Sequence, residues 1–270
     1  MTRPNRPQLL ASLAEGIAEL TTSGAWQRHL DYQSRFHRYS FGNVVLISAQ
    51  RPGATQVAGF RTWQRVHRRV KRGERAIWIL APVVRHRSED EETAVTTFRS
   101  VPVFDVAQTE GAEPPEVCRR LQGDDDANHY GRLTSVASAL GFLVVDATLE
   151  HGSNGDCCHE RRRIRVAQGN APVQRVKTLA HELAHAVLHR EVEDRRLAEL
   201  EAESTAYVVC RSLGVDAGCY SFGYITSWAG GCEAALAGLR RSGERIQRTA
   251  ALLLAVLDET TRSPAQCGPA

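Results

Sequence analysis

The sequence predicts an α+β fold in two domains: a basic N-terminal α+β domain and a mostly helical C-terminal domain with a small sheet. Its 270 residues, 42% of them apolar, favour one large or two modest globular domains. Residues 1–105 carry 16 Lys+Arg against 9 Asp+Glu, whereas the remainder carries 18 against 22. The acidic stretch TEGAEPPE separates these halves. We therefore expect domains at 1–110 and 129–270, joined by a linker region at 111–128.

Hydrophobic spacing predicts helices and strands in the first half. Leucines and an isoleucine spaced for one face predict that residues 7–30 are helical. An apolar stretch then ends at the turn Pro52-Gly53. A Trp-bearing helix from Phe60 leads through a turn at Arg72-Gly73 to the strand AIWILAPV. After a charged loop, a returning strand is expected over 98–106.

The second half is predicted to be helical around a pair of strands. A helix is expected over 129–140, and the unbroken apolar run FLVVD at 142–146 predicts a buried strand. The segment RRRIRV predicts a second strand, paired with the first across the loop HGSNGDCC. Asn170 is expected to cap the next helix, and two further helices complete the domain.

Two features of the composition bear on compartment. The sequence has no run of 18 apolar residues and no apolar core of a secretory signal, so we expect a soluble cytoplasmic protein without a membrane partner. Its seven cysteines are odd in number and form no CxxC pair. This pattern argues against a disulfide framework and against a thiolate zinc finger, so the adjacent Cys157 and Cys158 are expected to be reduced.

The stretch TLAHELAHAVLH, residues 178–189, contains an HExxH arrangement. On a helix, His181 and His185 lie one turn apart on one face and can bind the same ion. Glu182 can then act as the catalytic general base. Apolar residues surround both histidines, and each imidazole buried without a partner would cost about 1–3 kcal/mol, which a shared cation offsets. The alternative is an amphipathic helix that carries histidines by chance.

The third metal ligand must come from another segment, because Arg190 and Glu191 follow His189. The helix RRLAELEAESTAYVVCRSLG offers three glutamates: Glu199, Glu201 and Glu203. Its predicted inward face includes Glu203, which we predict to be the ligand; Glu201 is placed on a wetter side and Glu199 further out. The alternative is that all three are solvated charges. His189 drifts off the axis of the two ligands and is predicted to be structural or to support a ligand.

These groups predict peptide bond hydrolysis. Zinc lowers the pKa of its bound water and polarises a carbonyl, while Glu182 takes the proton and delivers it to the leaving amine. The segment RRRIRVAQ is a candidate edge strand that would align an extended peptide. Zn²⁺ is the expected cofactor, although Mn²⁺ or Fe²⁺ can take the same ligand set.

The second half of the chain resembles the zincin domain of ImmA/IrrE-type metallopeptidases. The resemblance is carried by VKTLAHELAHAVLH and by EAESTAY. It implies a zincin-like metallopeptidase domain with ligands at His181, His185 and Glu203 and the base at Glu182. The later stretch SFGYITSW resembles a pattern found where such domains are fused to a particular N-terminal domain.

Residues 7–105 resemble that N-terminal domain, the single-stranded-DNA-binding domain of the ArdC antirestriction family. The resemblance rests on YSFGNVVLISAQRPGATQVAGFRTW and VKRGERAIWILAP. Between Arg51 and Arg87, ten Lys+Arg and one Glu are interleaved with aromatic residues, which is typical of a single-strand binding groove. The alternative is an aromatic core beneath a solvated basic face. The candidate DNA-binding residues are Tyr39, Asn43, Arg61, Trp63, Arg68, Arg69, Lys71 and Arg72.

The sequence is compatible with three functions. In the first, a zinc peptidase is placed near an unidentified protein substrate by a domain that binds single-stranded DNA. In the second, a non-catalytic antirestriction protein covers single-stranded DNA and its metal is structural. In the third, the peptidase is retained and the basic domain docks a protein.

Overall fold

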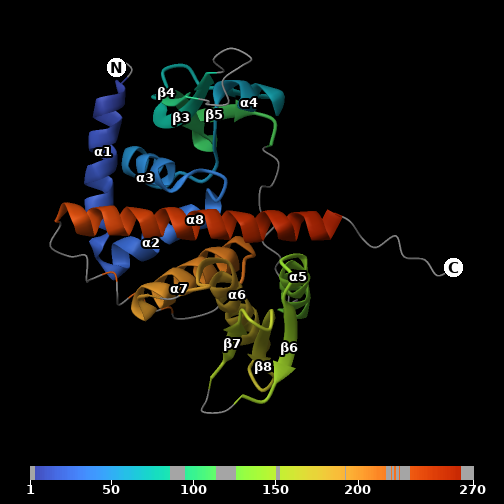
Figure 1. Ribbon diagram of the computed structural model, residues 1–270. Helices are drawn as coiled ribbons and strands as arrows, with labels where there is room; N and C mark the ends of the chain where they lie inside the picture. The colour runs from blue at the N-terminus through green and yellow to red at the C-terminus, as the bar shows by residue number, and fades with distance from the viewer. Residues whose placement is uncertain are drawn as a thin grey trace, which may run out of the picture. The chain divides into compact units, whose positions relative to one another are not determined.

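The computed structural model describes residues 4–85, 95–113, 126–149, 153–191, 193–216, 220, 222, 225 and 232–262. It has the expected mixed α+β architecture (Figure 1). The chain divides into two compact units: unit 1 comprises residues 1–20 and 39–117, and unit 2 comprises residues 21–38 and 118–270. None of the described helices is long and apolar enough to span a lipid bilayer.

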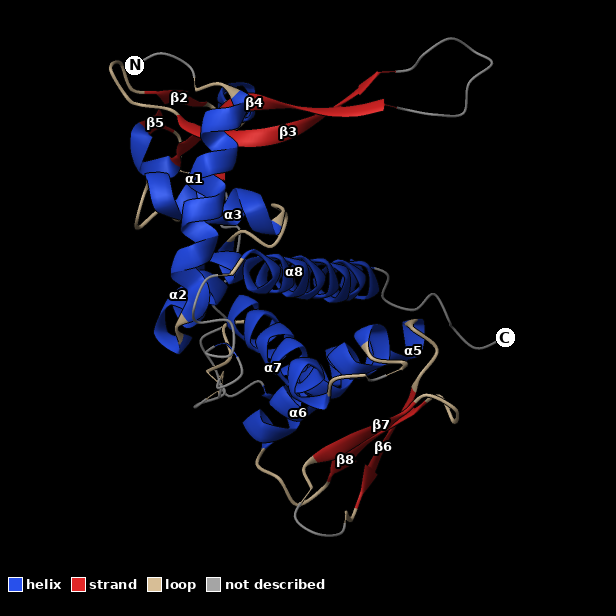
Figure 2. Ribbon diagram, turned by 60° about the vertical axis from the view of Figure 1, so that its left-hand side comes forward, coloured by secondary structure: helices blue, strands red, loops and turns tan. Residues whose placement is uncertain are grey.

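The described part of unit 1 combines three α-helices with two small antiparallel sheets. One sheet has the order β1-β4-β3 and the other pairs β2 with β5. The long hairpin of β3 and β4, seen in Figure 2, pairs Ile77 with Val103 at one end and Arg85 with Val95 at the other. Its connecting residues 86–94 lie outside the described residues. The elements are α1 (Arg6–Ala18), α3 (Phe41–Gln50), α4 (Phe60–Arg65), β1 (Val57–Ala58), β2 (Arg68–Val70), β3 (Ile77–Arg85), β4 (Val95–Asp105) and β5 (Thr109–Gly111).

Side-chain amides fasten α3 to β3. The Asn43 side chain donates to the carbonyl of Leu80 and accepts from its N–H, both at 2.9 Å. Gln50, two turns further along α3, makes the same two-way contact with the backbone of Trp78 at 2.8 and 2.9 Å. These bonds satisfy backbone groups on one side of the strand, so α3 acts as a partner for that part of β3.

Residues 7–30, which were expected to be helical, are divided between two helices. α1 ends at Ala18, a 3₁₀ turn covers Glu19–Thr21, and α2 begins at Ser23 and ends at Arg35. The break occurs at Thr22, whose side chain accepts a hydrogen bond from the N–H of Ala25 at 3.2 Å and so caps α2. A continuous apolar pattern had concealed this cap.

Helix α2 belongs to unit 2, although the sequence analysis placed residues 21–38 in the N-terminal domain. Trp26 is fully buried, and its indole N–H donates to the Ser204 hydroxyl at 3.0 Å. The hydroxyl of Tyr207 lies 2.7 Å from the Asp31 carboxylate, so α2 packs along α7. These contacts join residues about 180 positions apart, so residues 21–38 pack with unit 2.

Unit 2 places a three-stranded sheet beside a group of helices. The sheet has the order β6-β8-β7, in which β8 is parallel to β6 and antiparallel to β7. Helix α6 packs against β7, β8 and α7 (Figure 2). Besides α2, the elements are α5 (Asp126–Ala139), β6 (Leu143–Ala147), β7 (Gly155–Cys158), β8 (Arg163–Ala167), α6 (Pro172–Leu188), α7 (Arg195–Ser212) and α8 (Glu233–Arg262).

Three expectations for unit 2 need correction. The RRRIRV segment forms β8, which is the central strand, so the candidate edge strand is β7. Strand β6 is not a buried strand, because Leu143 is 65% exposed and only the preceding Phe142 is well buried. Helix α6 is capped by Ala171 rather than Asn170, with Pro172 at its first position and no side-chain cap.

Candidate metal centre

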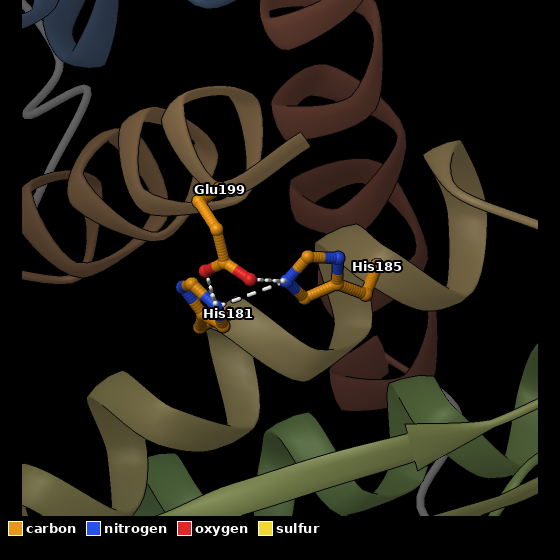
Figure 3. Close-up of side chains that lie close together, drawn as sticks. All are labelled: His181, His185 and Glu199. Carbon is orange, nitrogen blue, oxygen red and sulfur yellow. Dashed lines mark hydrogen bonds and ion pairs between the residues drawn. The ribbon is translucent and has the colours of Figure 1, made fainter. Parts of the chain in front are cut away.

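Helix α6 brings the two HExxH histidines together. Leu179 and Leu183 on this helix are fully buried and anchor it in the core, while the histidines lie at the edge of that core. The Nε2 atoms of His181 and His185 are 3.0 Å apart (Figure 3). Both rings present the same nitrogen to one point, so the i, i+4 spacing places them where one ion could contact both.

The carboxylate that joins them is Glu199 of α7. Its Oε2 lies 3.3 Å from Nε2 of His181, and its Oε1 lies 3.8 Å from Nε2 of His185 (Figure 3). The three donor atoms lie within 4.8 Å of one another. Two imidazoles and one carboxylate suit zinc chemically, and three protein ligands leave a fourth position for water or substrate.

Glu203, the predicted third ligand, lies on the opposite side of His181. Its Oε2 is 3.3 Å from Nδ1 of His181, and its Oε1 is 3.0 Å from Nζ of Lys177. The structure therefore groups Glu199, not Glu203, with the two Nε2 atoms. The apolar stripe of α7 correctly indicates the side of the helix that faces the core. The cleft, however, lies at the edge of that stripe, where Glu199 is half exposed.

Glu201 and His189 form a buried pair behind His185. Glu201 is 2% exposed, so its expected position on a wetter side is wrong. Its Oε2 lies 3.0 Å from Nε2 of His189, and the Ser242 hydroxyl and Arg245 Nε donate to the same carboxylate. The other ring nitrogen of His189, Nδ1, lies 3.0 Å from Nδ1 of His185, where the sequence analysis expected a supporting histidine.

Burial and neighbouring charges shift the pKa values of the groups at this site. Burial lowers the pKa of His181, but hydrogen bonds to Glu199 and Glu203 outweigh it and raise the pKa to about 9. Hydrogen bonds to His181 and His185 hold the pKa of Glu199 well below its usual range. Burial raises the pKa of Glu182 to about 7, against the opposing charge of His181. A carboxylate with that pKa is matched to general-base work near neutral pH.

A cleft of about 630 Å³ opens onto these groups, lined by β7, α6 and α7. Gly155 of β7 passes close to the base: a Cβ there would lie 3.0 Å from Oε1 of Glu182 and 2.6 Å from Cγ2 of Thr178. Cys157 also lines the cleft, and burial together with the charge of Glu182 raises the pKa of its thiol to about 12. Both Cys157 and Cys158 are free, as expected.

Four of the eight candidate DNA-binding residues are committed to the fold of unit 1. Asn43 bridges to β3, and Trp63 is buried with its indole N–H donating to the Phe104 carbonyl at 2.9 Å. The Tyr39 hydroxyl donates to the Val57 carbonyl at 2.8 Å. Arg68 donates to Thr109 through Nε at 2.8 Å and to the carbonyl of Ala112.

The other four candidates, Arg61, Arg69, Lys71 and Arg72, are exposed. Arg69 pairs with Glu110 at 2.7 Å across β2 and β5. Two phenylalanines of unit 1 are also exposed: Phe60, the neighbour of Arg61 in the chain, is 48% exposed, and Phe98 of β4 is 46% exposed. The exposure of Phe98 could not be predicted from the sequence, because alternation within a strand does not reveal which face is covered.

Comparisons with known proteins match each half separately. The model for the N-terminal domain of anti-restriction factor ArdC matches residues 8–108. The peptidase M78 model, an IrrE N-terminal-like domain, matches residues 137–210. Of the SFGYITSW stretch, only Phe222 and Ile225 lie within the described residues, and both are buried.

Longer similarities cover most of the chain. An uncharacterized protein of Bacillus anthracis is 24% identical over 246 aligned residues, which cover 73% of this chain and 42% of that relative. The chain therefore spans less than half of that relative's length. Crystal structures of the antirestriction protein ArdC from plasmid R388, metal-free and Mn(II)-bound, share the fold with a TM-score of 0.52 each. Their identities are 18% and 19%, covering 82% and 81% of this chain and 86% and 85% of theirs.

The two family models and the shared fold agree on the organisation of the chain. The ArdC model extends over residues 21–38, which pack in unit 2, and the IrrE model contains the HExxH helix and most of α7. This chain thus joins an ArdC-type N-terminal domain at residues 8–108 to an IrrE N-terminal-like, metallopeptidase-like domain at residues 137–210.

Proposed function

We propose that unit 2 is a metal-dependent endopeptidase and that unit 1 binds single-stranded DNA. The observation that carries the first half is the convergence of two imidazoles and a carboxylate beside Glu182, a buried acid whose pKa is about 7. His181, His185 and Glu199 would hold the metal, and Glu182 would act as the general base. When bound, such a metal supplies Lewis-acid activation of water and of a carbonyl.

The residues around the base suit an extended peptide. Among the described strands, β7 has β8 as its only partner, so its other edge offers backbone groups to a substrate strand. Gly155 and Cys157 of β7 line the cleft together with Glu182. A peptide paired with β7 would therefore place its backbone next to the general base.

The metal is proposed to be zinc, with Mn²⁺ as the alternative. Two nitrogens and one carboxylate oxygen form the usual ligand set of a catalytic zinc. Mn²⁺ and Fe²⁺ accept the same donors, and one of the R388 ArdC structures is Mn(II)-bound. Metal analysis of the purified protein beside His181→Ala tests the site, because removing one of three ligands should abolish stoichiometric binding.

The peptidase proposal is tested by Glu182→Gln. This substitution keeps the size of the side chain and removes the base, so metal content should stay stoichiometric while peptide cleavage falls by about 10²–10⁴-fold. The matched control is Glu244→Gln on α8, a partly exposed glutamate paired with Arg240. If Glu182→Gln leaves both metal content and biological activity intact, the site is a structural one. The protein would then act in antirestriction by covering DNA without catalysis.

The DNA proposal rests on the ArdC-type match and on the exposed basic surface of unit 1. Exposed Phe60 can stack on a base while Arg61, Lys71 and Arg72 neutralise phosphates, a combination that suits single strands without sequence preference. Protein binding releases counterions from the DNA phosphates, and this release is less favourable at high salt concentration. Affinity for an oligonucleotide should therefore fall as salt is raised.

Substitution in unit 1 separates DNA contact from folding. Joint replacement of Arg61, Lys71 and Arg72 by Gln should weaken binding. The slope of the logarithm of the binding constant against the logarithm of the salt concentration should become smaller by about two to three. Asn43→Ala is the control: it should loosen α3 from β3 and lower stability while leaving the charged surface in place. Equal affinity for duplex and single strand, or an unchanged salt slope in the triple variant, would contradict the proposal.

A further inference from the structure

We propose that helix α8 sets the orientation of the metal ligand His185 through a buried relay, His189 and then Glu201, and that Glu203 orients His181 in the same manner. The inference deepens the proposed function, since it assumes that His181 and His185 bind a metal through Nε2. It assigns Glu201, Glu203, Ser242 and Arg245 as positioning residues outside the ligand set.

The relay behind His185 is constrained by its donors and acceptors. A metal at Nε2 requires the neutral ring of His185 to carry its proton on Nδ1, which lies 3.0 Å from Nδ1 of His189. His189 must then accept at Nδ1, so its own proton is on Nε2, 3.0 Å from the Glu201 carboxylate. Each contact thus has one donor and one acceptor, and the carboxylate fixes the tautomer of both rings.

Helix α8 holds the far end of this relay. Ser242 donates to Oε1 of Glu201 at 2.8 Å, and Arg245 donates from Nε to Oε2 at 3.0 Å. A second Arg245 nitrogen donates to the carbonyl of Leu188 at 3.1 Å, at the C-terminal end of α6. Arg245 therefore ties together the helix that carries the histidines and the helix that carries the glutamates. Helix α8 lies beyond residues 137–210, the part matched by the IrrE N-terminal-like model.

Glu203 orients the ring of His181 by direct contact, without an intervening histidine. With Nε2 directed to the shared point, Nδ1 carries the proton and lies 3.3 Å from Oε2 of Glu203. Lys177 holds the other oxygen of Glu203 at 3.0 Å, and both of these side chains are mostly buried. Glu199 and Glu203, one turn apart on α7, therefore serve opposite nitrogens of one ring: Glu199 as ligand and Glu203 as its orienting acceptor.

The experiment compares metal affinity in two histidine variants of the full chain. His189→Phe keeps a ring of similar size and removes both nitrogens. His29→Phe is the matched control, since His29 is also a buried histidine of unit 2 but lies on α2. Competition of Zn²⁺ and Mn²⁺ against a chelator should show binding about 10–100-fold weaker in His189→Phe. Binding in His29→Phe should stay within about twofold of the wild type. The weaker binding in His189→Phe is expected to come from loss of its contact with the ligand His185, and His29 is not part of that relay.

Two further measurements exclude a merely structural explanation. In the zinc-loaded wild type, ¹⁵N spectra of labelled histidine should show His185 protonated on Nδ1 and His189 protonated on Nε2. In His189→Phe the Nδ1 proton of His185 should exchange faster with water. If the residues act in one relay, Glu201→Gln should add little to the loss already caused by His189→Phe. Unchanged affinity in a folded His189→Phe, or the opposite tautomers, would overturn the inference.

Arg245→Gln keeps the inference testable if His189→Phe does not fold. The Arg245 side chain is 42% exposed, so its replacement should be tolerated, and metal affinity should still fall. The outcomes separate the two proposals. If His181→Ala retains stoichiometric metal, the proposed metal centre is wrong. If His181→Ala loses the metal while His189→Phe and Arg245→Gln bind it as tightly as the wild type, the centre stands and the relay is wrong.

Discussion

A fragment that begins at residue 111 contains the whole region matched by the IrrE N-terminal-like model but lacks α2. We expect this fragment to be unfolded or marginally stable, because α2 supplies fully buried residues to unit 2. Trp26 and Leu30 are both 0% exposed, and the Trp26 indole bonds to the buried hydroxyl of Ser204.

The loss can be estimated from those contacts. Truncation of a buried Trp costs about 3–5 kcal/mol and of a buried Leu about 2–5 kcal/mol. Leaving the Ser204 hydroxyl without its partner adds about 1–3 kcal/mol. The total of about 6–13 kcal/mol is comparable with the whole stability of a typical domain, about 5–15 kcal/mol.

The assay is complementation in trans. Urea unfolding followed by circular dichroism, together with metal titration, would be measured for residues 111–270 with and without a synthetic peptide of residues 21–38. The peptide should restore a cooperative transition and stoichiometric metal binding, whereas a Trp26→Ala peptide should not. The assignment of α2 to unit 2 is refuted if the free energy of unfolding of the fragment alone is within about 1 kcal/mol of that of the metal-binding unit in the full chain.

Three further predictions concern unit 2. Burial lowers the pKa of His29 to about 4, so the unfolded chain binds a proton below pH 6.5 that the folded chain refuses until about pH 4. The free energy of unfolding should thus fall by about 3 kcal/mol between pH 6.5 and 4, and urea titrations should show this slope lost in His29→Phe. Gly155→Ala should bind metal normally but reduce peptide cleavage at least about tenfold, because the methyl group meets Glu182; unchanged kinetics would argue against the contact. Glu199→Gln should weaken Zn²⁺ binding more than Glu203→Gln in chelator competition, since a ligand matters more than its neighbour; the reverse order would restore Glu203 as the ligand.

The parts of the site that the sequence predicted are those set by local geometry. His181, Glu182 and His185 lie on one helix, where a spacing of four residues determines the face they share. The structure groups Glu199, rather than the predicted Glu203, with the two Nε2 atoms, and the sequence could not distinguish them because three glutamates at alternate positions of α7 differ only in helical phase. The sequence shows which side of α7 is apolar and faces the core. It does not show which edge of that apolar side borders the cleft.

The missed features of the fold depend on contacts between distant residues. The four residues of β7, GDCC, include a glycine and an aspartate, which are uncommon in strands, so no local pattern indicated the edge strand. Helix α2 packs in unit 2 because Trp26 and Asp31 contact residues of α7, which lie far along the chain. Helix α2 itself has an ordinary amphipathic pattern, which is compatible with packing in either unit.

The missing side chain at position 155 has a consequence for reading related sequences. A methyl group at this position would lie 2.6 Å from Cγ2 of Thr178 and 3.0 Å from both Oε1 of Glu182 and the carbonyl oxygen of Arg165, so the Thr178 side chain at least would have to move. A related protein that keeps both histidines and the glutamate of HExxH but has a larger residue here would retain a complete ligand set with a crowded base. Under the proposed peptidase function, such a protein is expected to bind metal and to cleave peptides poorly, and the residue at this position of an alignment would identify it.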